Sequence, residues 1–252
     1  MDEKQTRRRD ALRRLLSDLA VGGRESLLDL EDWLDRLERR RLTDPVRRWF
    51  VGAISCEWLD IEPPTDLCAE VAEHVMGYLQ RRPGSWANLW GHILRVTGTA
   101  QRIGEMVRAD PETVFLTAIL HDVRKLDARG YHEELGADYA RHLLSADVSK
   151  EQLLTIVQAI GIHPERPPAS WQVACILHDA DKLDKVGATG LLRRASAGED
   201  EEEACEGVWR MLDDAESLPP LCFQAARSHL LQPKMAFVQT LGRIIDDVCD
   251  ET

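Results

Sequence analysis

The spacing of the apolar residues constrains the fold of this chain more than any other feature of the sequence. Through most of the 252 residues, apolar positions recur every three or four residues, whereas the strict alternation that marks half-buried strands is nearly absent. In residues 87–108 the apolar positions fall on one continuous helical face, made by Leu89, Ile93, Val96, Ala100, Ile103 and Val107. The sequence therefore predicts an all-α protein.

Prolines divide this helical pattern into two parts. Pro63-Pro64 breaks the periodicity, and we place a domain boundary there, with an N-terminal helical extension in residues 1–62 and the main helical domain in residues 63–252. In the main domain an almost entirely apolar helix begins at Pro111, directly after the capping residue Asp110. The other helices that we expect cover about residues 5–20, 25–40, 45–59, 66–81, 87–108, 133–146, 149–161, 169–185, 203–214 and 220–248.

Charge and hydropathy narrow the classes of function. The formal net charge is −12, and because residues 1–50 are slightly basic, the acidic excess lies in the rest of the chain. An acidic body repels polyanions, which argues against nucleic acid as the main partner. The apolar runs are too short to cross a bilayer, and the N-terminus has no apolar signal segment. We therefore expect a cytoplasmic protein with no membrane partner.

Histidines and aspartates next to apolar helix positions are the candidate functional residues. His92 lies beside the apolar face of its helix, the pair His121-Asp122 follows the apolar helix that begins at Pro111, and Asp181 follows apolar residues in the helix expected over 169–185. Imidazole and carboxylate together suit divalent metals, and a mixed site leaves positions open for water and substrate. The sequence therefore predicts a metal site for one or two divalent ions, drawn from Fe, Mn, Zn, Co, Ni and Mg.

Other residues of the same types lack this context. His178-Asp179 is a second His-Asp pair, and we expect an outer-sphere pair or solvated side chains there rather than ligands. Asp184 is expected to be a solvated helix charge. The six cysteines include no Cys-x-x-Cys pair, which argues against both a disulfide framework and a thiolate zinc site.

Five segments resemble, in the same order, those of the HD-domain metal-dependent phosphohydrolases. They are HILRV (92–96), AILHDVRK (118–125), HEELGA (132–137), AIGIHPER (159–166) and DADKLD (179–184), and the likeness extends over residues 66 to about 248. Two departures stand out. Many family members have glycine in place of Arg124, and many two-metal members have a second histidine in place of Pro164. The resemblance implies a helical HD-domain bundle that carries the N-terminal helical extension.

The resemblance also implies roles for individual residues. His92, His121, Asp122 and Asp181 would form the primary metal site, and His132 and His163 would complete a two-metal site in which Asp122 bridges the ions. Asp122 would thus be catalytic as well as a ligand. Lys125 and Arg95 match positions often found near the substrate phosphate, so they are the other two expected catalytic residues.

The function implied by the family is hydrolysis of a small phosphate ester or anhydride by metal-activated water. A nucleotide is the expected substrate and partner, and HEELGA and AIGIHP resemble the branch that cleaves dinucleoside polyphosphates. Two alternatives stay open, a di-iron oxygenase of the same fold and a non-catalytic metal-binding regulator. A homodimer also stays open as a further partner.

Overall fold

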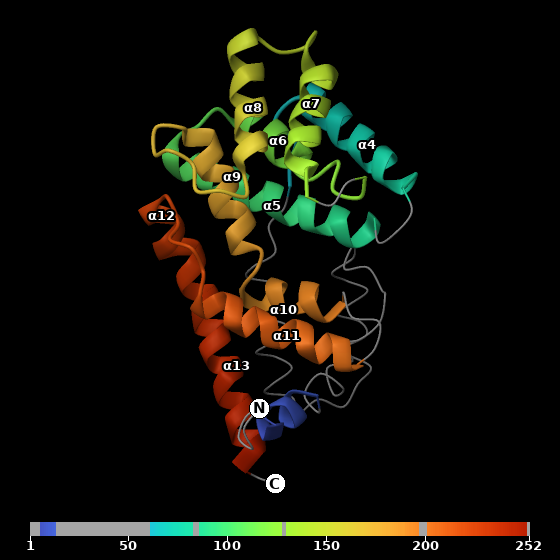
Figure 1. The fold of residues 1–252 in the computed structure, drawn as a ribbon. Coiled ribbons are helices and arrows are strands. Elements are labelled where there is room, and N and C mark those ends of the chain that lie inside the picture. Colours follow the sequence, from blue (N-terminus) through green and yellow to red (C-terminus); the bar gives the residue numbers. More distant parts are fainter. Residues whose placement is uncertain (1–5, 14–60, 83–85, 128–129, 197–200, 251–252) are drawn as a thin grey trace. The chain divides into compact units, whose positions relative to one another are not determined.

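The computed structural model describes residues 6–13, 61–82, 86–127, 130–196 and 201–250 (Figure 1). These residues form helices and no strands, which confirms the predicted all-α class. Apart from residues 6–13, which are helical, and residues 61–62, the predicted N-terminal extension lies outside the described residues. No helix in the described ranges combines the length and the apolarity that crossing a bilayer requires.

The described residues group into two compact units. The first, here called the larger unit, comprises the described part of Leu59–Asp184 together with Pro220–His229. The second, the smaller unit, comprises residues 6–13 and the described parts of Lys185–Pro219 and Leu230–Thr252. All the residues predicted to bind metal belong to the larger unit.

The larger unit is a bundle around a short central helix. Its helices are α4 (Asp66–Gln80), α5 (Trp86–Val107), α6 (Pro111–Leu120), α7 (His132–Leu144), α8 (Lys150–Ile162), α9 (Gln172–Leu183) and the short α12 (Gln224–Ala226). Helix α6 contacts α4, α5, α8 and α9, and α7 and α8 lie side by side (Figure 1). Every residue of α6 from Thr113 to Leu120 is buried, as expected for a helix that is apolar nearly all round.

Local sequence signals set the helix ends that carry the candidate side chains. The Asp110 carboxylate caps α6 by accepting a hydrogen bond from the backbone N–H of Thr113 at 2.9 Å, and Pro111 occupies the first turn. Helix α6 ends at Leu120, so His121 and Asp122 follow directly in a series of turns. Helix α7 approaches this point closely, because a Cβ added to Gly136 would lie only 3.2 Å from the backbone oxygen of His121.

The smaller unit contains one helix that the sequence did not predict. Helices α10 (Gly187–Ser196), α11 (Glu201–Glu216) and α13 (Gln232–Asp250) pack against one another. Helix α10 was missed because two glycines are unfavourable in helices. Both are needed locally: Gly187 has a φ of +86°, and a Cβ on Gly190 would lie 2.6 Å from the oxygen of Lys185.

The single helix predicted over residues 220–248 is wrong in its first part. The chain instead forms α12, a π-helix at Arg227–Leu231, and then α13. Pro233 supplies the physical reason, since it has no N–H and cannot make the α-helical hydrogen bond back to His229.

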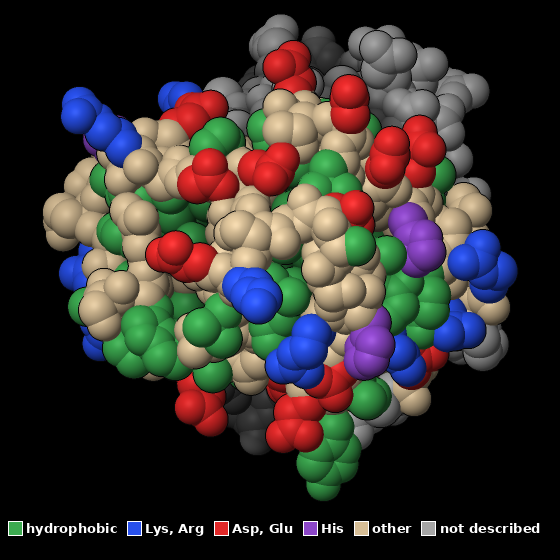
Figure 2. Space-filling view, turned by 90° about the horizontal axis from the view of Figure 1, so that it is seen from above, with side chains coloured by type: hydrophobic (Ala, Val, Ile, Leu, Met, Phe, Trp, Pro, Cys, Tyr) green, Lys and Arg blue, Asp and Glu red, His purple; other side chains and the backbone are tan. Residues whose placement is uncertain are grey.

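Figure 2 shows one face of the molecule, on which acidic and basic side chains are intermixed with hydrophobic ones.

Candidate metal centre

The structure brings together all six residues that the sequence proposed as metal ligands. His92 projects from α5, His121 and Asp122 follow α6, His132 begins α7, His163 follows α8 and Asp181 lies near the end of α9. Their ligand atoms form two groups, each with all atoms within 4.8 Å of one another: His92, His121 and Asp181 in one, and Asp122, His132 and His163 in the other. Except for His132, which is partly exposed, these residues are buried.

Hydrogen bonds fix the orientation of three of the imidazoles. The Nδ1 atoms of His121 and His163 donate to the backbone oxygens of Ala118 and Ile160, at 2.7 and 2.8 Å. The Nδ1 of His92 lies 2.7 Å from a carboxylate oxygen of Asp184. Carbonyl and carboxylate oxygens only accept hydrogen bonds, so in each neutral ring the proton is on Nδ1 and Nε2 keeps its lone pair. This is the tautomer that a metal-ligating histidine needs.

The Nε2 atoms converge on the carboxylate of Asp122. Those of His92 and His121 lie 3.2 and 3.5 Å from Oδ2. Those of His132 and His163 lie 3.3 and 3.5 Å from Oδ1. Each oxygen of Asp122 therefore faces a different pair of histidines, so this one carboxylate adjoins both groups of donors.

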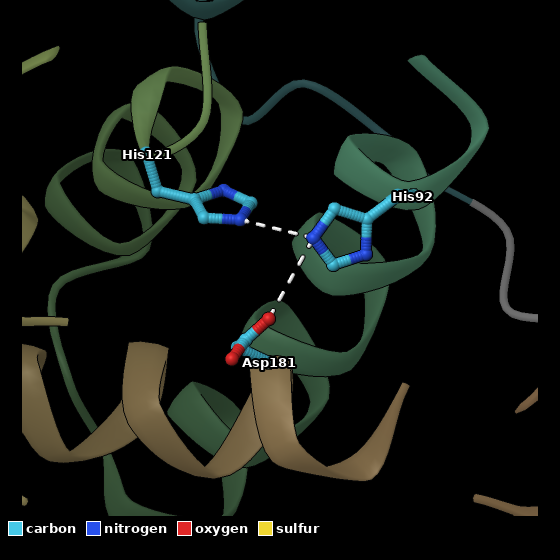
Figure 3. A group of neighbouring side chains, drawn as sticks. All are labelled: His92, His121 and Asp181. Carbon is cyan, nitrogen blue, oxygen red and sulfur yellow. Dashed lines mark hydrogen bonds and ion pairs between the residues drawn. The ribbon is translucent and has the colours of Figure 1, made fainter. Parts of the chain in front are cut away.

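The first group is drawn in Figure 3. His121 Nε2 lies 3.4 Å from His92 Nε2, which in turn lies 3.6 Å from Oδ1 of Asp181. In the tautomers described above, the two nitrogens present lone pairs to each other. Such a contact is favourable only when a cation lies between the donors.

Burial and charge give these groups the protonation states that metal binding requires. Burial lowers the pKa of His121 to about 3, because it outweighs the opposing effect of the Asp122 charge. Burial alone would raise the pKa of Asp122, but its interactions with His121 and His132 outweigh burial and hold that pKa well below its usual value. Near neutral pH the site therefore presents a neutral His121 and an ionised Asp122.

The donor set fits divalent metal ions. Oδ1 of Asp122 is buried and accepts no hydrogen bond, and His163 cannot donate to it because its proton is on Nδ1. Buried oxygens without a partner are rare in folded proteins and call for an explanation such as a bound ion. Mixed imidazole and carboxylate donors suit Zn, Fe, Ni and Mn.

Two basic residues that we expected near the substrate adjoin the centre in different ways. The Lys125 ammonium contacts Oδ2 of Asp122, and its side chain is 39% exposed. Arg95 is linked to His92 through Asp184, which contacts both residues. The Nε and Nη2 atoms of Arg95 donate to the two oxygens of Asp184 at 2.7 and 3.3 Å.

Asp184 is a residue of the candidate centre that the sequence interpretation missed. We expected a solvated helix charge, but only 3% of Asp184 is exposed and its carboxylate joins His92 to Arg95. A signal was present, because Asp184 lies three residues after Asp181 and therefore on the same side of α9.

The second His-Asp pair has different surroundings. The expectation of solvated side chains there is wrong, since His178 and Asp179 are almost completely buried. The Asp179 carboxylate accepts backbone hydrogen bonds from Cys222 at 2.7 Å and Phe223 at 2.9 Å. Asp179 therefore holds the segment before α12 against α9.

Comparisons with known proteins identify the part of the chain that contains these residues. Residues 89–186, which contain all six candidate ligands, match the family model of the HD domain. The chain is similar to the crystal structure of a predicted HD superfamily hydrolase from an uncultured Thermotogales bacterium, with 20% identity over 69% of this chain and 91% of that one and a TM-score of 0.52. It is also similar to an HD-superfamily hydrolase from Bacillus thuringiensis, with 18% identity over 73% of this chain and 97% of that one and a TM-score of 0.50.

No curated protein matches the sequence. At the identities found for the two crystal structures, the likeness establishes the fold. The resemblance inferred from the five sequence segments is thus confirmed: residues 89–186 are an HD domain, and the chain has the fold of the HD-superfamily hydrolases.

Proposed function

We propose that the protein is a metal-dependent phosphohydrolase that cleaves a small phosphate ester or anhydride, most simply of a nucleotide. The observation that carries the proposal is the buried Asp122 carboxylate, whose two oxygens face separate pairs of imidazole Nε2 atoms. This arrangement suits a pair of divalent ions, with Asp181 as the further carboxylate donor. Bound there, such ions polarise a phosphoryl oxygen and lower the pKa of bound water, which is the chemistry that phosphoester hydrolysis needs.

The residues around the donors have separate tasks in this proposal. Asp122 links the two groups and keeps its charge at neutral pH. Lys125 is the main candidate for binding a phosphoryl oxygen, because it lies beside Asp122 and also reaches solvent. Arg95 would contribute a second positive charge. Because the Nε and Nη2 atoms of Arg95 bind Asp184, the substrate would contact Arg95 through its Nη1 atom.

The identity of the substrate rests on the sequence resemblance. The segments HEELGA and AIGIHP favour a dinucleoside polyphosphate among the nucleotides. Such a substrate carries several negative charges, so an acidic protein needs local cations to bind it. Lys125, Arg95 and the bound ions would supply them.

The test is a metal analysis followed by a hydrolysis screen. Full-length protein purified without chelator should contain divalent metal, and it should release phosphate or a mononucleotide from a panel of nucleotides and dinucleoside polyphosphates. Chelation should abolish turnover, and adding back Mn²⁺, Fe²⁺, Co²⁺ or Zn²⁺ should restore it. Metal that stays bound while no member of the panel is cleaved would favour the non-catalytic regulator. Iron-dependent oxygen consumption would favour the oxygenase.

Helix α7 offers a matched pair of variants for this test. His132→Gln removes a proposed ligand, whereas His142→Gln removes an exposed histidine that bonds only the backbone oxygen of Asp138 among the contacts described. We expect the first variant to lose metal and turnover, and the second to keep both. Equal losses in the two variants would contradict the assignment.

A further inference from the structure

A second cluster of metal-binding side chains lies in the larger unit and contains sulfur. Ligand atoms of His178, Asp179 and Cys222 all lie within 4.8 Å of one another. The Nδ1 of His178 is 3.2 Å from Oδ1 of Asp179 and 3.9 Å from the Cys222 sulfur. None of these three residues belongs to the six-residue centre.

The fold builds this cluster from two distant segments. His178 and Asp179 are fully buried in α9, whereas Cys222 is partly exposed and comes 44 residues later than His178. The two hydrogen bonds that Asp179 accepts, from the backbone N–H groups of Cys222 and Phe223, hold the backbone of this segment next to α9. A search for Cys-x-x-Cys spacing does not detect such a site, because its donors meet only in the folded chain.

The geometry favours chelation over a catalytic relay. In a Cys-His-Asp triad the acid and the nucleophile lie at opposite ring nitrogens of the histidine. Here both the Asp179 oxygen and the Cys222 sulfur lie at the same nitrogen, Nδ1 of His178. Three donors around one point are what a metal ion requires.

The spacings and the donor chemistry suit zinc. Zinc bonds of about 2.3 Å to sulfur and about 2.0–2.2 Å to nitrogen and oxygen hold the donors about 3.3–3.6 Å apart in a tetrahedron. The nitrogen–oxygen separation of 3.2 Å lies just below that range and the nitrogen–sulfur separation of 3.9 Å just above it, so small side-chain adjustments would bring the donors to these distances. Each Asp179 oxygen accepts one backbone hydrogen bond and can still offer a second lone pair. A thiolate, an imidazole and a carboxylate are all zinc ligands.

We propose that Cys222, His178 and Asp179 bind a zinc-class divalent ion at a site separate from the six-residue centre. Asp179 and Asp181 are two residues apart on α9, so their side chains point to different sides of the helix. The ion would link the segment before α12 to α9. Solvent or a further protein donor would occupy the fourth position.

Cobalt substitution tests this site without interference from the first one. Thiolate-bound Co²⁺ has an intense sulfur-to-metal charge-transfer absorption, and the six-residue centre contains no sulfur. Metal-free full-length protein titrated with Co²⁺ should develop this band, and Zn²⁺ should abolish it. Cys222→Ser should lose the band, while keeping the backbone N–H that bonds Asp179. Cys249→Ser, which removes a cysteine of the smaller unit, should retain it.

Two further measurements make the outcome decisive. Asp122→Asn should keep the band, since it alters only the first centre, and the result therefore does not depend on the proposed hydrolase activity. In the unmodified chain, Zn²⁺ should slow alkylation of Cys222 by iodoacetamide at least tenfold, as followed by peptide mass spectrometry. Absence of the band at saturating Co²⁺, its survival in Cys222→Ser, or an unchanged alkylation rate would each overturn the proposal.

Discussion

The chain contains two His-Asp dipeptides, and they end up in different chemical environments. Both His121-Asp122 and His178-Asp179 are buried. The oxygens of Asp122 face imidazole nitrogens, and one of them accepts no hydrogen bond. Both oxygens of Asp179 instead accept backbone N–H groups. The groups that surround a carboxylate, which come from distant parts of the chain, therefore determine its role more than the dipeptide does.

Removing the charge of Asp122 should have the largest effect. Asp122→Asn keeps the shape of the side chain but takes the shared carboxylate from both groups of donors. Mutation of a residue that only supports a metal ligand typically lowers metal affinity or activity 10–100-fold. Asp122 is proposed to be a ligand itself, so we expect a larger loss, of about 1,000-fold or more, in metal affinity and in any hydrolytic turnover. Metal analysis after dialysis and a phosphate-release assay measure the two losses.

The matched control for this variant is Asp138→Asn on α7. Asp138 is exposed and pairs with Arg141 on the surface. This change should leave metal content and turnover unaltered. Full metal content in Asp122→Asn would contradict the role that we assign to the first dipeptide.

Acid should destabilise the metal-free protein through His121. Its pKa is about 3 in the folded protein and about 6.5 in an unfolded chain, so between these values only the unfolded chain binds the proton. The free energy of unfolding should therefore fall as the pH drops from 6.5 towards 3, by up to about 4 kcal/mol. Asp122, whose pKa is also lowered, adds a loss in the same direction below about pH 4.

Urea unfolding of the metal-free protein between pH 7 and pH 4 measures this slope. His121→Gln replaces the titrating ring by a neutral side chain, so the variant should show a shallower slope over the same range. An identical slope in the variant and the parent would show that His121 does not cause it.

Removal of the Asp179 side chain should mainly affect folding. Asp179→Ala leaves the backbone N–H groups of Cys222 and Phe223 without their acceptor. Hydrogen bonds to charged groups contribute about 1.5–3 kcal/mol each, so we expect a loss of about 3 kcal/mol in the free energy of unfolding. Urea denaturation of the metal-free protein measures it, with Asp138→Ala expected to lose less than about 0.5 kcal/mol. A similar small loss in Asp179→Ala would remove the distinction between the two dipeptides.

The sequence predicted which residues make the candidate site better than it predicted how they are held. His92, His121, His132 and His163 were recognisable because their segments occur in the order seen in a known family. Their orientation depends on partners that no motif specifies, such as the backbone oxygens of Ala118 and Ile160.

The same limit explains the errors in the fold. The bounds of α4 to α9 agree with apolar periodicity to within a few residues, because burial of one face determines them. Helix α10 was missed since its glycines serve local packing, and the π-helix before α13 depends on the adjustment of the backbone around Pro233. Both features depend on tertiary contacts, which the helix propensities of individual residues do not reflect.

The smallest effect should come from Asp184, which acts on the first centre through His92. Asp184→Asn keeps the size of the side chain and removes the charge that holds His92 Nδ1 at 2.7 Å. We expect metal affinity to fall about 10–100-fold, the usual effect of losing such a partner. Competition with a chelating dye gives the dissociation constants of parent and variant.

Arg95→Gln separates the two contacts that Asp184 makes. This change removes the guanidinium from Asp184 but leaves the contact between Asp184 and His92. If orientation of the imidazole is what matters, metal affinity should fall clearly less in Arg95→Gln than in Asp184→Asn. Equal losses would mean that Asp184 acts chiefly by binding Arg95, and His92 would then owe its orientation to the packing of α5 alone.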